Sequence, residues 1–385
     1  MKIVIFGLTL SSSWGNGHAT PYRALLRGLR RLGHEVSFYE KDVEYYYWRR
    51  DFREVDYCDL VLYLEWHDVR QRAMQAAAEA DAVIIGSFCP EGARIADEAL
   101  ALAKPAKVFY DLDTPVTLKE LAKGDVDYLR RDQLPAYDLV LSFTGGAVLD
   151  ELEQKWKARK ARPLYGCVDP EVYRRVPASP DFACGLSYMG THSRDREQKL
   201  RELFLDVAQQ NPSDEFLLAG TMYPAEWTYP TNVRRVDHVA PTRHAEFYSS
   251  CRATLNLTRG DMAANGWCPS GRFFEAAACG SPLFSDYFPG LEDFFADGEE
   301  LRIARSTEDV LAAMSLSDSE LQQMARRACE RTLEHHTGFR RATELAIYLE
   351  QLRSPISPLI SDGPDIRFSP AGEKVGHSNA GQPLP

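Results

Sequence analysis

The sequence predicts an α/β protein made of two Rossmann-like, doubly wound domains in tandem. Short apolar runs rich in β-branched residues alternate with helix-length segments along most of the chain, which is typical of parallel strands joined by crossover helices. A stretch of mixed polarity, punctuated by Pro163, Pro170, Pro177 and Pro180, divides this alternation into two series and is typical of a linker. The length of 385 residues is sufficient for two domains of ordinary size.

The first series contains strands that we expect at Lys2–Phe6, Glu35–Tyr39, Leu60–Leu64, Ala82–Ile85, Lys107–Tyr110, Leu139–Phe143 and Arg162–Tyr165. The helices of this series are expected at Pro21–Leu32, Ala73–Ala80, Ala93–Ala103 and Ala147–Lys157. In the second series, strands are expected at Gly185–Met189, Phe216–Ala219, Val233–Val236, Ala253–Leu257, Pro282–Phe284 and Leu301–Ile303. Its helices are expected at Arg194–Gln209, Arg243–Ser250, Gly271–Cys279 and from about Thr307 to Gln351.

Composition restricts the classes of function. The net charge of −11 argues against a general affinity for nucleic acid, because phosphate binding needs a basic surface. The eight cysteines are scattered singly, without metal-ligand spacing, so we expect buried, reduced thiols and no metal site. Neither a signal-peptide pattern nor a membrane-length apolar run is present, which favours a cytoplasmic protein without a transmembrane segment.

The loop SSSWGNGH follows the first strand and leads into a helix and a second strand that ends on acidic residues. This order is that of a dinucleotide site, but only Gly15 and Gly17 fit the fingerprint G-x-G-x-x-G, since Thr20 stands at the third glycine position. The loop is also too long for the tight turn that places a pyrophosphate on the helix N-terminus. We therefore expect it to frame a substrate cleft and not to bind NAD.

Polar residues at strand ends supply candidates for acid–base chemistry. His18 is expected near the start of a helix, whose dipole favours the neutral imidazole that can accept a proton from a hydroxyl. Alternatively, His18 caps the helix or packs against it. Asp111 and Asp113, in FYDLDTPV, follow another strand, and one of them could orient His18. Equally, Asp113 or Thr114 could cap the helix that begins at Pro115.

Two further segments follow strands, the first at the same edge of the first domain and the second in the second domain. LVLSFTGG brings Ser142 and Thr144 to that edge of the first domain, or is a plain strand-to-helix turn. YMGTHSRDR places glycine, small hydroxyls and two arginines at a strand-to-helix junction, which suits a diphosphate; an exposed arginine pair is the alternative.

The most specific pattern lies in Leu255–Asp286. Ser270 and Gly271 follow a proline and open a helix whose N-terminus can hold phosphate and sugar oxygens, with Arg272 nearby. Glu275 lies one turn into this helix, where its carboxylate could accept hydrogen bonds from two ribose hydroxyls.

Together these segments resemble GT-B glycosyltransferases, and more closely the CgeB-like (spore-maturation-protein-type) group. The resemblance runs from residue 1 to about 350 and rests on the NGH loop, YDLDTPVTLKEL, LSFTGG, YGCVDPEVY, YMGTHSRDR, LNLTRGDM and RFFEAAACGSPLFSD. It implies two Rossmann-like domains that face each other across a cleft: an acceptor domain over 1–172 and a nucleotide-sugar-binding domain over 180–336. A C-terminal helix over 337–353 is expected to pack back on the first domain, and 354–385 to form a flexible tail rich in Pro, Gly and Ser.

The resemblance also assigns roles to single residues. The donor-binding residues that it implies are Glu275 at the ribose, Ser270, Gly271 and Arg272 near the phosphates, Thr191 and Arg194 beside the diphosphate, His238 near the nucleobase, and Arg259. The candidate catalytic residues are His18, Asp113 and Asp111, and the candidate acceptor-binding residues are Trp14, Asn16, Gly17 and Thr144.

The implied function is transfer of a hexosyl unit from a nucleoside-diphosphate sugar, expected to be a UDP-sugar, to a hydroxyl on a glycan, natural product or lipid-linked acceptor, without a metal or other cofactor. A non-hydrolysing nucleotide-sugar epimerase and a catalytically inactive binding module are the alternatives. Many retaining relatives carry a glutamate where this chain has Trp267, whereas His18 with an aspartate is similar to the pair of inverting relatives. Both stereochemical outcomes stay open.

A final feature is the aromatic and basic segment VEYYYWRRDFR, Val43–Arg53, preceded by a helix with Arg23, Arg27 and Arg30 at i, i+4 and i+7. It could contact a membrane surface peripherally or a long carbohydrate. Alternatively, its aromatic side chains belong partly to the core and partly to a cleft wall, with the arginines in solvent.

Overall fold

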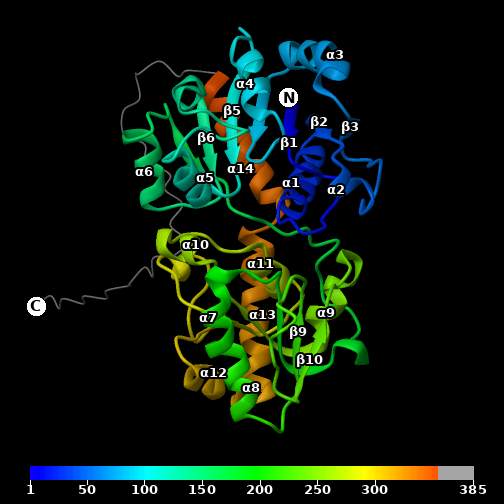
Figure 1. Cartoon of the computed structure of the whole chain (residues 1–385), viewed down its shortest axis with the longest axis vertical. Helices are drawn as coiled ribbons and strands as arrows, with labels where there is room; N and C mark the ends of the chain where they lie inside the picture. The colour runs from blue at the N-terminus through cyan, green and yellow to red at the C-terminus, as the bar shows by residue number, and fades with distance from the viewer. Residues whose placement is uncertain (354–385) are drawn as a thin grey trace, which may run out of the picture.

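The computed structural model describes residues 1–353 and consists of two α/β domains, one above the other in Figure 1. Each domain contains one parallel sheet with helices packed against it. This architecture confirms the predicted fold class of two doubly wound domains. The predicted tail, 354–385, lies outside the described residues.

The first sheet has the strand order β3-β2-β1-β4-β5-β6-β7, and its pairings are parallel. The order reverses at β1, which pairs with both β2 and β4, so the loops after β1 and β4 leave in opposite directions and open a crevice. Residues 8–18 follow β1 at this point. The strands are β1 (Lys2–Gly7), β2 (Glu35–Lys41), β3 (Asp59–Tyr63), β4 (Ala82–Gly86), β5 (Ala106–Asp111), β6 (Leu139–Ser142) and β7 (Ala161–Pro163).

The second sheet has the order β10-β9-β8-β11-β12-β13, again with parallel pairings. Its order reverses at β8, which pairs with β9 and β11, so residues 190–193 and 257–259 lie at this second crevice. The strands are β8 (Cys184–Met189), β9 (Phe216–Ala219), β10 (Val233–Val236), β11 (Cys251–Asn256), β12 (Leu283–Ser285) and β13 (Arg302–Ile303).

Side-chain alternation along the strands builds a core on each face of the first sheet. Ile3 and Ile5 of β1 belong to the cluster that also contains Leu25 of the first helix, whereas Val4 and Phe6 belong to the cluster on the opposite face. All four side chains are at most 3% exposed. Because both faces are buried, the strand is apolar from Ile3 onward, as is typical of parallel sheets.

The helices lie largely where the sequence predicts them. The short helix Glu44–Tyr47 was not predicted, and the segment predicted as one helix over Arg194–Gln209 is divided into a 3₁₀ turn, two short α-helices and a π-helical turn between them. The helix predicted from Ala73 begins already at Trp66, because Trp66 and Val69 face the core. The loop expected after β11 contains a short helix, α10. The helices are α1 (Ala19–Arg31), α2 (Glu44–Tyr47), α3 (Trp66–Glu79), α4 (Gly92–Leu100), α5 (Thr114–Leu121), α6 (Ala147–Gln154), α7 (Glu197–Leu200), α8 (Asp206–Gln210), α9 (His244–Ser250), α10 (Gly260–Asn265), α11 (Gly271–Ala278), α12 (Thr307–Met314), α13 (Asp318–His335) and α14 (Gly338–Arg353).

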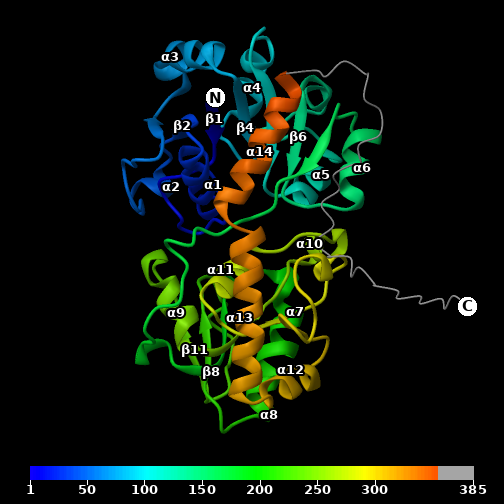
Figure 2. The same ribbon diagram turned by 180° about the vertical axis from the view of Figure 1, so that it is seen from behind.

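The last two helices run along both domains. Figure 2 shows α13 on the lower domain and α14 crossing the back of the upper domain. Gly338 of α14 meets Gly28 of α1, and a Cβ added at either glycine would lie within 3.0 Å of backbone atoms of the other helix. The two glycines therefore permit the close approach that fastens the end of the described chain to the first domain.

Direct contacts hold the carboxyl edges of the two sheets face to face. The Gly145 N–H donates a hydrogen bond to the Trp267 carbonyl oxygen at 3.0 Å, and the Lys119 ammonium pairs with Asp261 at 2.8 Å. The Trp267 indole lies against Gly146, where an added Cβ would come closer than 3.0 Å to the ring. Trp267 therefore belongs to the domain interface.

Candidate active site

A cleft of about 620 Å³ separates the two domains. The loops after strands of both sheets line it, as expected for ligand sites at the carboxyl edges of parallel sheets. The first domain contributes residues 13–18 of the loop after β1, together with Asp113, and the second domain contributes residues 189–191, 257–259 and 270–272.

His18 and Asp113 form a hydrogen-bonded pair in the wall of the first domain. His18 Nε2 lies 2.6 Å from Asp113 Oδ2, and His18 is 7% exposed. The Asn16 carboxamide oxygen accepts the backbone N–H groups of His18 and Ala19 at 3.0 and 3.2 Å, which fixes the start of α1. Among residues 1–353, His18 Nδ1 has no hydrogen-bond partner. The imidazole is thus oriented through Nε2, and its Nδ1 is buried without a partner in the described chain.

The two aspartates after β5 have different roles. Asp111 Oδ1 accepts the Thr117 hydroxyl at 2.8 Å and the Asp113 N–H at 3.1 Å, and burial raises the pKa of Asp111 to about 7. Burial acts to raise the pKa of Asp113 too, but the hydrogen bond and electrostatic interaction with His18 and the charge of Arg259 together outweigh it, and the pKa of Asp113 is lowered. Asp113, and not Asp111, is therefore the ionised partner of His18. Its carboxylate caps no N–H group of α5 in the described chain.

Three of the four candidate acceptor-binding residues line the cleft, and the fourth is buried away from it. Trp14, Asn16 and Gly17 line the cleft. Thr144 does not: it is fully buried, and its hydroxyl lies 3.1 Å from the Ser142 hydroxyl. The expectation for Thr144 is corrected because the turn after β6 folds back on itself and is covered by Trp267.

The start of α11 faces the cleft from the second domain. Ser270 precedes this helix and donates a hydrogen bond from its hydroxyl to Asn256 Oδ1 at 2.6 Å. Its side chain therefore does not cap the first-turn N–H groups of α11. Arg272 Nη1 donates to the Met189 carbonyl oxygen at 2.8 Å, which ties α11 to the end of β8. Open N–H groups, the helix dipole and a guanidinium together favour an anion.

Glu275 lies behind Arg272 at the same end of α11. It is 6% exposed, and its Oε2 accepts the Tyr248 hydroxyl at 3.5 Å. Burial raises the pKa of Glu275 to about 7, although Arg272 and the hydroxyls of Tyr173 and Tyr248 act in the opposite direction. A buried carboxylate with weak partners is suited to accept hydrogen bonds from ligand hydroxyls.

Arg196 is a cleft residue that the site prediction missed. It is 8% exposed, and its Nη2 donates to the Thr191 carbonyl oxygen at 2.7 Å, whereas its Nε has no partner within residues 1–353. Arg194, which was predicted for this position, is exposed and does not line the cleft. The 3₁₀ turn at Arg194–Arg196 directs the two side chains differently, a detail that the pattern RDR does not contain.

Two further predicted donor residues lie at the cleft. Arg259 Nε is 3.3 Å from Asp195 Oδ2, and the Arg259 charge contributes to the lowered pKa of Asp113 across the cleft. The His238 ring lies 4.6 Å from the Trp14 ring, centre to centre, and so bridges the domains. Both side chains are solvent-accessible and can reach a ligand.

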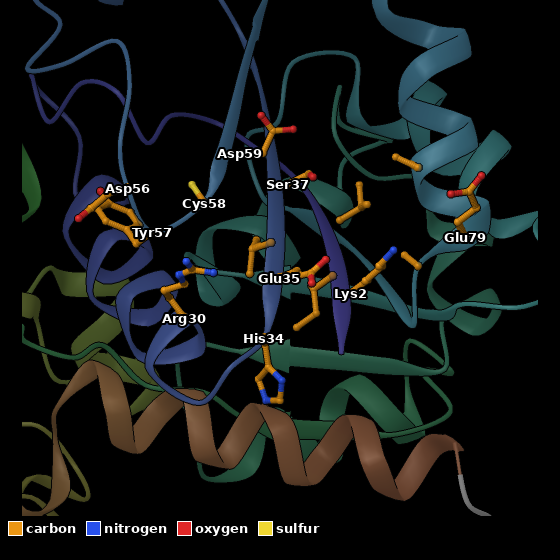
Figure 3. A pocket seen from close by; sticks show the side chains of 15 residues that line it. Lys2, Arg30, His34, Glu35, Ser37, Asp56, Tyr57, Cys58, Asp59 and Glu79 are labelled. Atoms are coloured by element: carbon orange, nitrogen blue, oxygen red, sulfur yellow. The ribbon is translucent and has the colours of Figure 1, made fainter.

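A second cavity, of about 420 Å³, lies at the amino ends of β1 and β2 (Figure 3). This is the edge opposite to the cleft, away from the strand ends where ligands of such sheets bind. Acidic side chains outnumber basic ones around it, which is unfavourable for a phosphate. Its ionisable residues include Lys2, Arg30, His34, Glu35, Asp56, Asp59 and Glu79.

Two kinds of feature are absent from residues 1–353. In this range no group of three or more His, Cys, Asp or Glu side chains is arranged to hold a metal ion. No helix in the same range combines the length and the apolar character that a membrane crossing requires.

Comparison with known proteins relates this geometry to a fold. A family model described as glycosyl transferase-like matches residues 196–346. Sucrose-phosphate synthase from Thermosynechococcus elongatus is 12% identical, with a TM-score of 0.64 over 92% of this chain and 99% of that chain. An alpha-glucosyltransferase in complex with UDP-glucose and DNA containing an abasic site is 12% identical, with a TM-score of 0.67 over 91% and 99%.

HepE from Anabaena in complex with UDP and glucose is 13% identical, with a TM-score of 0.57 over 91% of this chain and 100% of that chain. A search of curated proteins gave no significant match. The chain therefore has the GT-B fold, and its residues 196–346 are similar to the glycosyl transferase-like family.

Proposed function

We propose that this chain transfers a hexosyl unit from a UDP-sugar to a hydroxyl of an acceptor. One observation carries the proposal: two arginines and the open start of α11 face the His18–Asp113 pair across a single cleft. Cations and helix N–H groups are needed where the leaving diphosphate gains charge, and a base is needed where the acceptor loses a proton.

The second domain holds the donor in this proposal. Arg196 and Arg272 bind the diphosphate with the first-turn N–H groups of α11, and Glu275 accepts the ribose hydroxyls. The segment with His238 lies beside the nucleobase. Arg196 has an unpartnered Nε within the described chain, so a phosphate oxygen would satisfy a donor that is otherwise buried and unpaired. Metal independence is part of the proposal, with the arginines as counter-charge.

The first domain supplies the acid–base pair. In a direct displacement, the acceptor oxygen bonds to the anomeric carbon, and the bond from that carbon to the diphosphate oxygen breaks with its electron pair going to UDP. The acceptor proton passes to His18, whose Nδ1 is buried and without a partner in residues 1–353 and must become accessible when the acceptor binds. Asp113 fixes the imidazole through Nε2 and stabilises the imidazolium that forms. Trp267 lies in the domain interface and not among the cleft-lining residues, so it takes no part in this step.

The comparisons support the donor class. Solved structures of the same fold hold UDP-glucose or UDP, and the glycosyl transferase-like region of this chain contains Arg196, Arg272 and Glu275. Membership of the CgeB-like group belongs to the proposal and rests on the motifs quoted above. One similar structure contains DNA, but the net charge of −11 makes nucleic acid an unfavourable acceptor here.

Thermal-shift and calorimetric titrations with UDP, GDP, dTDP, CMP, NAD and uridine test the proposal. UDP should stabilise the protein, because binding to the folded state raises its apparent stability. Arg196→Ala should weaken the binding of UDP by roughly tenfold or more, because it removes a charged contact to phosphate. The binding of uridine, which has no phosphate, should change little. Arg194→Ala, two residues away and exposed, is the matched control and should bind UDP like the wild type. Stabilisation by NAD without any response to a nucleoside diphosphate would contradict the proposal.

A further inference from the structure

Three aromatic side chains at α2 are exposed to solvent. Tyr45 is 57%, Tyr47 36% and Trp48 77% exposed. We call Tyr45, Tyr47 and Trp48 the aromatic shelf. Large aromatic rings normally contribute to cores, and an exposed group of them marks a binding surface more often than a solitary exposed residue does.

The shelf is continuous with the cleft. Tyr46, on the same turn of helix, lines the cleft. The Tyr45 hydroxyl packs on Gly15, where an added Cβ would lie less than 3.0 Å from it. The Arg49 guanidinium lies over the Trp14 ring, 3.9 Å from its centre. The shelf is therefore fixed to the loop that carries His18, and α2 lies beside α1 on the flank of the upper domain (Figure 1).

The charge around the shelf selects the class of ligand. Residues 42–56 contain five acidic and three basic side chains. The three arginines are engaged: Arg49 lies over Trp14, Arg50 pairs with Asp42, and Arg53 lies over the Tyr47 ring at 5.5 Å. Arg23 of α1 is likewise paired, with Asp51 at 2.6 Å. The segment therefore offers no cluster of free cations, which anionic lipids and phosphate backbones both require.

Neutral carbohydrate fits what remains. Sugar rings present C–H groups with partial positive charge on one face, and the negative face of an aromatic ring attracts them. Tyrosine and tryptophan also offer polar atoms at the ring edge for sugar hydroxyls. We propose that the aromatic shelf binds sugar units of a neutral glycan acceptor, outside the cleft and remote from the hydroxyl that reacts. This inference rests on the proposed function, since it names the acceptor class of that same site.

Affinity electrophoresis tests the shelf without turnover. The protein is run in native gels that contain dextran, laminarin, arabinoxylan or galactomannan, all neutral polysaccharides. At least one should retard the wild-type protein, and the double variant Tyr47→Ala/Trp48→Ala should bind it roughly tenfold more weakly, because each ring contact contributes about two- to tenfold. Tyr287→Ala is the matched control: Tyr287 is 37% exposed, on the other domain, and its loss should change nothing.

Three results would overturn the inference: no retardation in any of the four gels, equal retardation of the double variant, or sedimentation with phosphatidylcholine/phosphatidylglycerol (3:1) vesicles that the double variant loses. UDP-induced thermal stabilisation is measured on the same proteins. The double variant should keep it, which also shows that the variant is folded. Absence of UDP stabilisation in the wild-type protein would refute the proposed donor, whereas the gels decide on the shelf independently.

Discussion

Replacing Glu275 by glutamine should stabilise the unliganded protein at alkaline pH and weaken its binding of UDP. Burial raises the pKa of Glu275 from 4.5 to about 7. In the unfolded chain this carboxyl ionises near 4.5, so between about pH 4.5 and 7 the folded state holds a proton that the unfolded state has released. The contribution of Glu275 to stability therefore falls as the pH rises through this window, and it stays low above pH 7.

The expected magnitude follows from the two pKa values. A raise from 4.5 to about 7 corresponds to about 3 kcal/mol of lost stability above pH 7. Glutamine fills the same space without a charge and avoids this loss. Glu275→Gln should thus match the wild type near pH 4.5 and exceed it by about 3 kcal/mol at pH 8.

Urea unfolding at several pH values between 4.5 and 8 measures this difference. Burial also raises the pKa of Asp111, but that contribution is common to both proteins and cancels in the comparison. Glu226→Gln, at an exposed glutamate of the same domain, is the control and should follow the wild type at every pH. A pH-independent difference between Glu275→Gln and the wild type, or a loss of stability at pH 8, would refute the reasoning.

Two further predictions concern the acid–base pair and the domain interface. Asp113→Asn should lower the rate of UDP release with acceptor by about 10²-fold and leave UDP affinity unchanged, because Asp113 orients the base and does not touch the donor; weakened UDP binding would contradict this role. Gly146→Ala should cost about 3 kcal/mol, since φ is +67° and the Cβ would strike the Trp267 ring. Gly33→Ala, at φ +79° with no described atom within 4 Å, should cost only about 1 kcal/mol in urea unfolding, and equal losses would exclude the ring contact as the cause.

The sequence predicted the fold because local signals agree along the chain. Runs such as Phe216–Ala219 are apolar on both faces, as strands buried between two helix layers must be, and the structure has β9 at the same residues. The ends of helices and strands are harder to predict where distant segments bury a side chain. Trp66 shows this: it begins α3 because its ring packs near Phe6, a contact that no local pattern contains.

The sequence was sufficient to predict where the site lies, but not which side chains contact one another in it. Strand ends identified the edge at which His18, Asp113 and Glu275 lie, because parallel strands bring their carboxyl ends together. The choice between Asp111 and Asp113 required the geometry of the turn after β5, in which Thr117 takes the first carboxylate. Thr144 was misjudged because Trp267, more than a hundred residues later, covers its turn. Arg196 was missed for a local reason, since a 3₁₀ turn and a regular helix direct side chains differently.

A crystal structure of the complex with UDP tests the central claim most directly. We expect the diphosphate to lie between Arg196, Arg272 and the start of α11, the ribose hydroxyls to bind Glu275, and the uracil to lie beside residues 238–241. UDP bound instead on the loop at residues 15–17 of the first domain, in the manner of a dinucleotide, would contradict the claim.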